Sequence, residues 1–117
     1  MVIISEDFVF KNEILNDSTE IFLYYSKMYG EYVAYGYSAY NVWRKLYYQK
    51  EPLDVSYSEQ FQMPQILVDE NQMSQLLKGE VTLSDSVEGM YYHVQTFTPF
   101  KEDEYFEWAS AIRVNRV

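Results

Sequence analysis

Gly79-Glu80-Val81-Thr82-Leu83 is the stretch at which the hydrophobic pattern of this chain changes its period. After the glycine, Val81 and Leu83 alternate with polar neighbours, as in a strand with one buried face. Residues 90–97 are rich in Tyr, Val, Phe and Thr and predict a second strand. Residues 106–114 also alternate, with Phe106 and every second residue after it on one face, and predict a third. We therefore expect an antiparallel sheet at the C-terminal end.

Upstream of this point the pattern favours helices. Residues 69–77 begin with acids and end just before Lys78 and Gly79, which predicts a short helix. Residues 38–47 have apolar side chains at helical spacing, with Ser38 as their cap. Residues 17–29 resemble a capping box followed by an apolar stripe. Residues 31–37 fit either a strand or a turn between helices.

The order of these elements predicts an α+β fold, with helices in the N-terminal half packed on a C-terminal antiparallel sheet. The chain has 117 residues, no internal repeat and no Pro/Gly-rich linker, so we expect a single acidic globular domain over residues 1–117. Its 48% hydrophobic content, with 13 Tyr, 7 Phe and 2 Trp, is enough for a folded core. Zero cysteine excludes disulfides and thiol chemistry and fits a reducing compartment.

The charge of the chain is strongly acidic and unevenly placed. There are 18 Asp plus Glu against 9 Lys plus Arg, a formal net charge of -9. Residues 51–107 hold twelve acids and two bases, whereas residues 1–50 hold six acids and five bases, and residues 108–117 hold two bases. Such a field repels nucleic acid and anionic lipid and attracts a basic protein. The twelve acids are therefore the candidate partner-binding residues: Glu51, Asp54, Glu59, Asp69, Glu70, Glu80, Asp85, Glu88, Glu102, Asp103, Glu104 and Glu107.

Enzymatic function has little support in the sequence. The single histidine, His93, lies in a strand-like run, and no Gly-x-Ser-x-Gly elbow or glycine-rich phosphate loop is present. Residues 85–89 combine acids with a glycine but lack the ligand spacing of a calcium loop. We expect no catalytic residues, no metal and no cofactor. Paired carboxylates for acid catalysis remain an alternative, because 18 acids form many pairs.

Two further alternatives concern nucleic acid and location. Trp43-Arg44-Lys45 could form a stacking patch for single-stranded nucleic acid, although three nearby bases would have to overcome an acidic body. The amino terminus reaches acids after only three consecutive apolar residues and carries no basic segment, so we expect neither a signal peptide nor a membrane span. The protein is expected in the cytoplasm.

A short, cysteine-free, acidic and aromatic-rich chain without catalytic motifs resembles the small bacterial DNA-mimic proteins. In length and acidity it is similar to the neisserial DNA mimics that bind the histone-like protein HU. The resemblance covers the profile of the whole chain and no shared motif. It implies a monomeric or weakly associating protein that reaches the nucleoid through its partner, with an acidic face on the DNA-binding surface of an HU-like protein. Arg44, Lys45 and Lys50 should lie outside that face.

The function expected from the sequence is therefore a DNA-mimic binding protein that competes with DNA for a basic DNA-binding protein. Carboxylates would stand in for the phosphates of the duplex, at lower charge density. The first alternative is an immunity protein or phage-type inhibitor of a basic nuclease, which would use the same charge complementarity. A small carboxylate-dependent enzyme is the alternative from another class.

Overall fold

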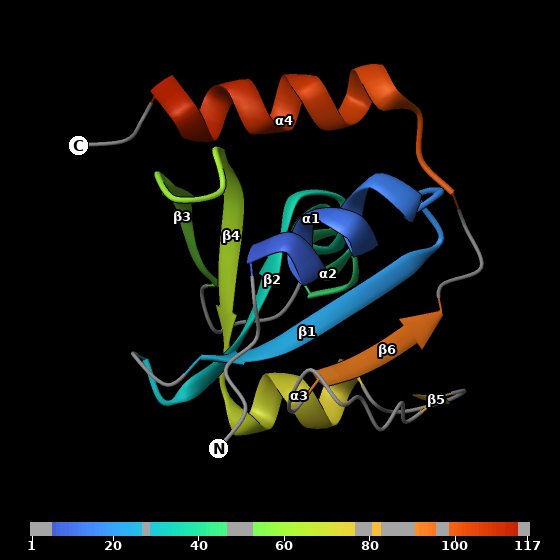
Figure 1. Ribbon diagram of the computed structural model, residues 1–117, viewed down its shortest axis with the longest axis vertical. Helices are drawn as coiled ribbons and strands as arrows, with labels where there is room; N and C mark the ends of the chain where they lie inside the picture. Colours follow the sequence, from blue (N-terminus) through green and yellow to red (C-terminus); the bar gives the residue numbers. More distant parts are fainter. Residues whose placement is uncertain are drawn as a thin grey trace.

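The computed structural model describes residues 6–26, 29–46, 53–76, 81–82, 91–95 and 99–114. These residues form four helices and six strands, and single helices alternate with pairs of strands along the chain (Figure 1). In chain order the elements are α1 (Glu6–Leu15), β1 (Glu20–Ser26), β2 (Glu31–Tyr35), α2 (Gly36–Leu46), β3 (Asp54–Ser58), β4 (Met63–Val68), α3 (Glu70–Leu76), β5 (Val81–Thr82), β6 (Tyr91–Gln95) and α4 (Glu102–Val114).

The six strands form one antiparallel sheet in the order β3-β4-β2-β1-β6-β5. Strand β1 is central: it pairs with β2 through Tyr24 and Val33, and with β6 through Phe22 and His93. Gly30, with a φ of 66°, lies in the connection between β1 and β2, where a left-handed backbone suits glycine. The partner β6 is far from β1 in sequence, so the sheet joins both halves of the chain.

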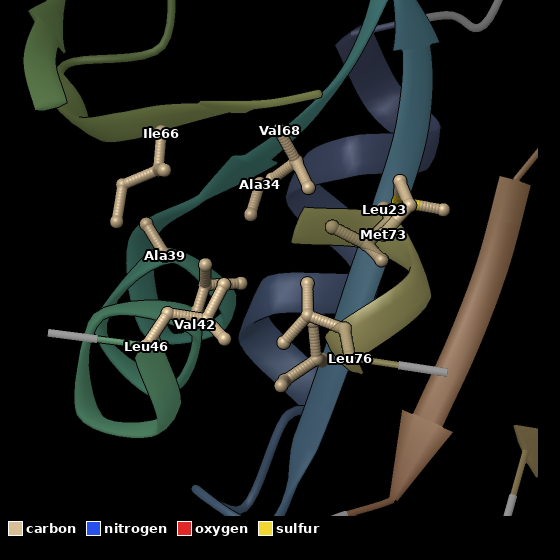
Figure 2. Close-up of a cluster of buried hydrophobic side chains, with 10 residues drawn as sticks. Leu23, Ala34, Ala39, Val42, Leu46, Ile66, Val68, Met73 and Leu76 are labelled. Carbon is tan, nitrogen blue, oxygen red and sulfur yellow. The ribbon is translucent and has the colours of Figure 1, made fainter. Parts of the chain in front are cut away.

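Helices α2 and α3 cover one face of this sheet. Figure 2 shows side chains from β1, β2 and β4 converging on those of the two helices. Ile21, Leu23 and Ile66 are fully buried there. The complete cluster comprises Ile21, Leu23, Ala34, Ala39, Val42, Leu46, Ile66, Val68, Met73 and Leu76.

Helix α1 contributes to a second, smaller core made mostly of aromatic side chains. Val9 packs with Phe22, Tyr24 and Phe61, all buried. Phe22 and Tyr24 alternate along β1 with Ile21 and Leu23 of the first core, and successive residues of a strand point to opposite faces. Both faces of β1 are therefore buried, which gives three layers: α1, the sheet, and α2 with α3.

Helix α4 packs against β3, β4 and α2. It lies across one end of the molecule in Figure 1, and α3 lies at the opposite end of the same long axis. Its buried anchor is Tyr105, which forms a third cluster with Tyr40 and Phe100. Half-buried aromatic rings of Tyr37, Trp43 and Trp108 complete this contact.

The expected arrangement of helices on a C-terminal sheet is wrong, although the fold is α+β. Helix α1 precedes the sheet, α2 lies between strands, and four of the six strands precede residue 69. Residues 17–29 were expected to be a helix, but Glu20–Ser26 form β1. A strand covered on both faces has a continuous apolar run, and such a run does not show the period of two.

The C-terminal strand expected over residues 106–114 is also wrong, because Glu102–Val114 form α4. The buried and half-buried positions are Tyr105, Trp108, Ala109 and Ile112, spaced by three and four residues, whereas Phe106 is exposed. The expected alternation had left Tyr105 outside its buried face. Three acids in the first turn and Arg113 in the last also complement the helix dipole.

Several expected elements are confirmed. The helix over residues 69–77 is α3, and the strand over residues 90–97 is β6. The helix over residues 38–47 is α2, which begins two residues earlier, at Gly36. The ambiguous residues 31–37 divide between β2 and the start of α2. Helix α1 and strands β3 and β4 were not predicted.

Gly36 stands where a side chain has no room. Its φ is 56°, and a Cβ atom there would lie 2.7 Å from the sulfur of Met63. We expect Gly36→Ala to lower the free energy of unfolding by about 1–2 kcal/mol, because the left-handed backbone is strained for alanine and Met63 must move. Urea unfolding measures this loss. Gly30→Ala is the comparison, since it has a similar φ and nothing within 4 Å; an effect as large at Gly30 would mean that the contact with Met63 contributes nothing.

No helix among the described residues is long and apolar enough to cross a membrane.

Candidate acidic surface

Four exposed carboxylates lie within the first six residues of α4: Glu102, Asp103, Glu104 and Glu107. Asp103 and Glu107 are four residues apart, and Glu104 and Glu107 are three apart, so these side chains are neighbours on the helix surface at about 5–6 Å between Cβ atoms. We call these four residues the α4 acidic surface. It is the densest group of the predicted acids among the described residues.

The body of the protein fixes the start of α4. The amide of Phe100 donates a hydrogen bond to Ser18 Oγ at 3.2 Å, and the amide of Tyr105 donates to the carbonyl of Lys101 at 3.3 Å. The ring of Tyr105 lies 4.7 Å from that of Tyr37 between centroids. The acids therefore lie on a helix whose position is fixed by packed aromatic rings.

The carboxylates of this surface lie close to aromatic hydroxyls. Burial raises the pKa of Tyr37, and the negative charge of Glu102 raises it further. Burial likewise raises the pKa of Tyr40, and Glu104 adds to that shift. A favourable interaction with the helix N-terminus explains three of the four acids, since it acts within the first turn. Glu107 lies beyond that turn.

The remaining predicted acids are spread around the molecule. Asp54 is exposed at the start of the edge strand β3, and Glu59 is exposed in the connection to β4. Glu70 is exposed on α3, at the end of the molecule opposite α4 (Figure 1). The described acids therefore do not form a single cluster. Four predicted acids lie outside the described residues: Glu51, Glu80, Asp85 and Glu88.

Asp69 has a structural role that accounts for its carboxylate. Its Oδ1 accepts a hydrogen bond from the amide of Gln72 at 2.8 Å. The amide of Asp69 in turn donates to Gln72 Oε1 at 3.0 Å. This reciprocal pair is a capping box at the N-terminus of α3, so Asp69 contributes first to helix stability.

Two arginines lie against aromatic rings. The guanidinium carbon of Arg44 is 5.4 Å from the ring centroid of Phe100 and 5.9 Å from that of Tyr40. Arg113, in the last turn of α4, lies 5.9 Å from the ring centroid of Tyr57. Helix α4 is therefore acidic at its start and basic at its end. Trp43 packs against the aromatic cluster, and Lys50 lies outside the described residues.

The sequence did not single out a buried polar cluster where α1, β1 and α2 meet. Its members include Glu13, Asn16, Ser38 and Asn41. Asn16, Ser38 and Asn41 are buried, and Asn16 bonds the carbonyl of Glu20 at 3.0 Å. Polar residues within apolar stretches are the only signal that could have found them, and that signal does not separate a buried position from a surface one.

The described residues offer no group of three or more His, Cys, Asp or Glu that could hold a metal ion. His93 lies in β6, at the register position opposite Phe22. Exposed carboxylates on a helix attract cationic groups, and half-buried aromatic rings beside them add contact area. The α4 acidic surface can therefore attract cationic groups.

Comparison with known proteins finds nothing similar: no family model, no curated protein and no solved structure matches this chain.

Proposed function

We propose that the protein is a DNA-mimic binding protein: its α4 acidic surface occupies the DNA-binding surface of a basic, HU-like protein and competes with DNA. The observation that carries the proposal is the exposure of four carboxylates in the first six residues of a helix anchored by Tyr105. Carboxylates at neighbouring positions on a helix repel one another, and a positively charged partner would relieve that repulsion.

The rigidity of the surface supports this proposal. Tyr105 is buried, and its neighbours Phe100 and Tyr40 come from outside α4, so the helix does not have to be ordered at the moment of binding. Phe106 is 54% exposed beside the acids and would supply apolar contact to the partner. Compared with the twelve acids expected from the sequence, the proposed contact is smaller and lies on one helix.

The proposal includes a location and a mode of action. The protein would act in the cytoplasm as a monomer, reach the nucleoid only through its partner, and bind neither nucleic acid nor a cofactor. The net charge of -9 is consistent with repulsion from DNA itself.

The test is a gel-shift competition in which the protein displaces DNA from HU. We expect displacement at low salt that weakens as salt rises, because exposed charges are screened over about 10 Å at 0.1 M ionic strength. The quadruple variant E102Q, D103N, E104Q and E107Q should need at least about ten times more protein for the same displacement, since it removes the charges and keeps the side-chain shapes.

A second quadruple variant is the matched control. It neutralises four exposed acids outside α4: D7N, D17N, D54N and E70Q. It has the same net charge as the first variant, so it should displace DNA almost as well as the unmodified protein. Equal losses in both variants would leave only a net-charge effect and contradict the α4 surface. Absence of displacement by the unmodified protein at low salt would overturn the HU-like partner.

A further inference from the structure

Arg44 of α2 contacts both the body of the protein and the segment that leads into α4. Its Nη1 donates a hydrogen bond to Asn41 Oδ1 at 2.9 Å. Its guanidinium carbon lies 5.4 Å from the ring centroid of Phe100 and 5.9 Å from that of Tyr40. A cation is attracted to the face of an aromatic ring within about 6 Å of the centroid. Because α4 begins at Glu102, Arg44 contacts the chain just before the acidic helix.

The bond to Arg44 fixes the orientation of the Asn41 side chain. A guanidinium group has donors and no acceptor, so Asn41 turns its oxygen toward Arg44. Its amide nitrogen, Nδ2, then faces the other way and donates to the carbonyl oxygens of Ser18 at 3.0 Å and Glu20 at 3.1 Å. Asn41 is buried, and Glu20 is the first residue of β1. Arg44 therefore acts through Asn41 on the backbone that leads into the central strand.

Four residues form a closed set of contacts around the start of α4. Ser18 accepts the hydrogen bond from Asn41 at its carbonyl and a second one, from the amide of Phe100, at its Oγ. Arg44 connects Asn41 with the ring of Phe100 and so completes the set. Ser18 and Phe100 are 82 positions apart in the sequence. We call Arg44, Asn41, Ser18 and Phe100 the Arg44 contact set; it joins α2, the start of β1 and the start of α4.

The positive charge of Arg44 by itself opposes binding of a basic partner. Burial raises the pKa of Tyr40, the negative charges of Glu104 and Glu107 add to that rise, and the positive charge of Arg44 partly offsets it. The two carboxylates and the guanidinium group therefore act on the same hydroxyl. A cation beside the α4 acidic surface weakens the attraction of that surface for a basic partner. If only charge mattered, removing Arg44 would strengthen binding.

We propose that Arg44 is a positioning residue of the α4 acidic surface: it fixes the start of α4 through Phe100 and Asn41, and this effect outweighs the negative charge that it neutralises. The inference rests on the proposed function, because it concerns binding through the same four carboxylates. Lysine cannot take this role, since its ammonium group lacks the planar fork that bonds Asn41 and lies against aromatic rings at the same time. A loosely held α4 would have to be ordered on binding, which lowers affinity.

The first experiment measures the displacement of DNA from HU by Arg44→Lys and Arg44→Gln. Arg44→Lys keeps the net charge of -9, yet we expect it to need about three to ten times more protein than the unmodified chain for the same displacement. Arg44→Gln should also be weaker, although it makes the chain more acidic. Displacement by Arg44→Lys as strong as that of the unmodified protein would overturn the positioning role, whatever the result for Arg44→Gln.

Lys45→Gln is the matched control. Lys45 is the next residue of α2, is half-buried like Arg44 and lies outside the Arg44 contact set. The substitution removes the same charge as Arg44→Gln, so it should displace DNA at least as well as the unmodified protein. A loss as large as that of Arg44→Gln would show that the effect is not specific to Arg44 and would contradict the proposal.

A second experiment tests the position of α4 without a partner. The amide of Phe100 bonds Ser18 Oγ, whereas the amide of Met73 bonds the carbonyl of Asp69 in α3, at the opposite end of the molecule (Figure 1). In Arg44→Lys, hydrogen exchange followed by NMR should be about three- to tenfold faster at Phe100 and unchanged at Met73. Equal acceleration at both amides would mean that Arg44 contributes only to overall stability. That result, or an unchanged rate at Phe100, would overturn the positioning role.

The two experiments separate this inference from the proposed function. If the unmodified protein leaves DNA bound to HU at low salt, the HU-like partner is wrong. The exchange rate at Phe100 then still decides whether Arg44 fixes the start of α4, because no partner takes part in that measurement.

Discussion

Replacing Leu23 by alanine is expected to lower the free energy of unfolding by about 3–4 kcal/mol. Leu23 is fully buried in the central strand β1, within the core that α2 and α3 form with the sheet (Figure 2). The substitution removes three carbon atoms from a site enclosed by a sheet and two helices, so the surroundings cannot close fully over the space left behind. Urea unfolding followed by circular dichroism measures the loss as a lower midpoint with an unchanged slope.

The matched control for this substitution is Leu15→Ala. Leu15 ends α1 and is 69% exposed, so the same chemical change removes little buried surface. Leu15→Ala should change the free energy of unfolding by no more than about 0.5 kcal/mol. Comparable losses at both positions would mean that Leu23 is not enclosed, and the position of β1 at the centre of the fold would be wrong.

Strand β1, which was expected to be a helix, shows what local sequence can and cannot predict. Residues 69–77 were assigned correctly because acids at the start and Lys78 with Gly79 at the end are signals of helix termini, and residues 90–97 because Tyr, Val, Phe and Thr favour strands. Residues 21–24 are apolar without interruption, since Phe22 and Tyr24 meet α1 while Ile21 and Leu23 meet α2 and α3. Only the tertiary structure supplies the second covering layer, so the run was compatible with either a helix or a strand.

Helix α4 shows the opposite error, because a strand was expected where the structure has a helix. Its aromatic residues and small residues fit a period of two and a period of 3.6 over so short a length, and the buried position of Tyr105 depends on Tyr37 and Phe100. The acids in its first turn were the more informative signal for a helix. Those acids were predicted as candidate binding residues, but their place at a helix N-terminus was not predicted.

The candidate site also has a part that local sequence predicts and a part that depends on tertiary structure. Charge can be counted along a chain, so the acids of α4 were found. Their separation from Glu70, at the far end of the molecule, depends on how α3 and α4 are placed in space (Figure 1). The meeting of Glu13 with Ser38 joins residues 25 positions apart, and no local pattern encodes that contact.

Replacing Asn41 by leucine should lower the free energy of unfolding by about 2–3 kcal/mol, although the two side chains have nearly the same shape. Asn41 is 1% exposed, and its Nδ2 donates to the carbonyl oxygens of Ser18 at 3.0 Å and Glu20 at 3.1 Å. Leucine offers no donor. The carbonyl of Glu20 keeps its hydrogen bond from Asn16. The buried carbonyl of Ser18 loses its hydrogen bond from Asn41.

The position of Ser18 makes that loss costly. Its φ is 76°, a conformation that few residues other than glycine adopt, and it is held by Asn16 Oδ1, by Asn41 and by the bond from Phe100 to its own Oγ. Freed from Asn41, Ser18 can relax only by giving up contacts that connect β1 with the start of α4. We therefore expect the Trp108 environment to change together with the stability in Asn41→Leu.

Asn71→Leu makes the same chemical change at an exposed position of α3 and is the control. Its free energy of unfolding should stay within about 0.5 kcal/mol of the unmodified protein. A loss at Asn41 no larger than that at Asn71 would show that the hydrogen bond to Ser18 contributes no net stability. In that case the buried polar cluster would fix only the geometry of the junction between α1, β1 and α2, and the aromatic cluster around Tyr105 and Phe100 would stabilise α4 on the body of the protein.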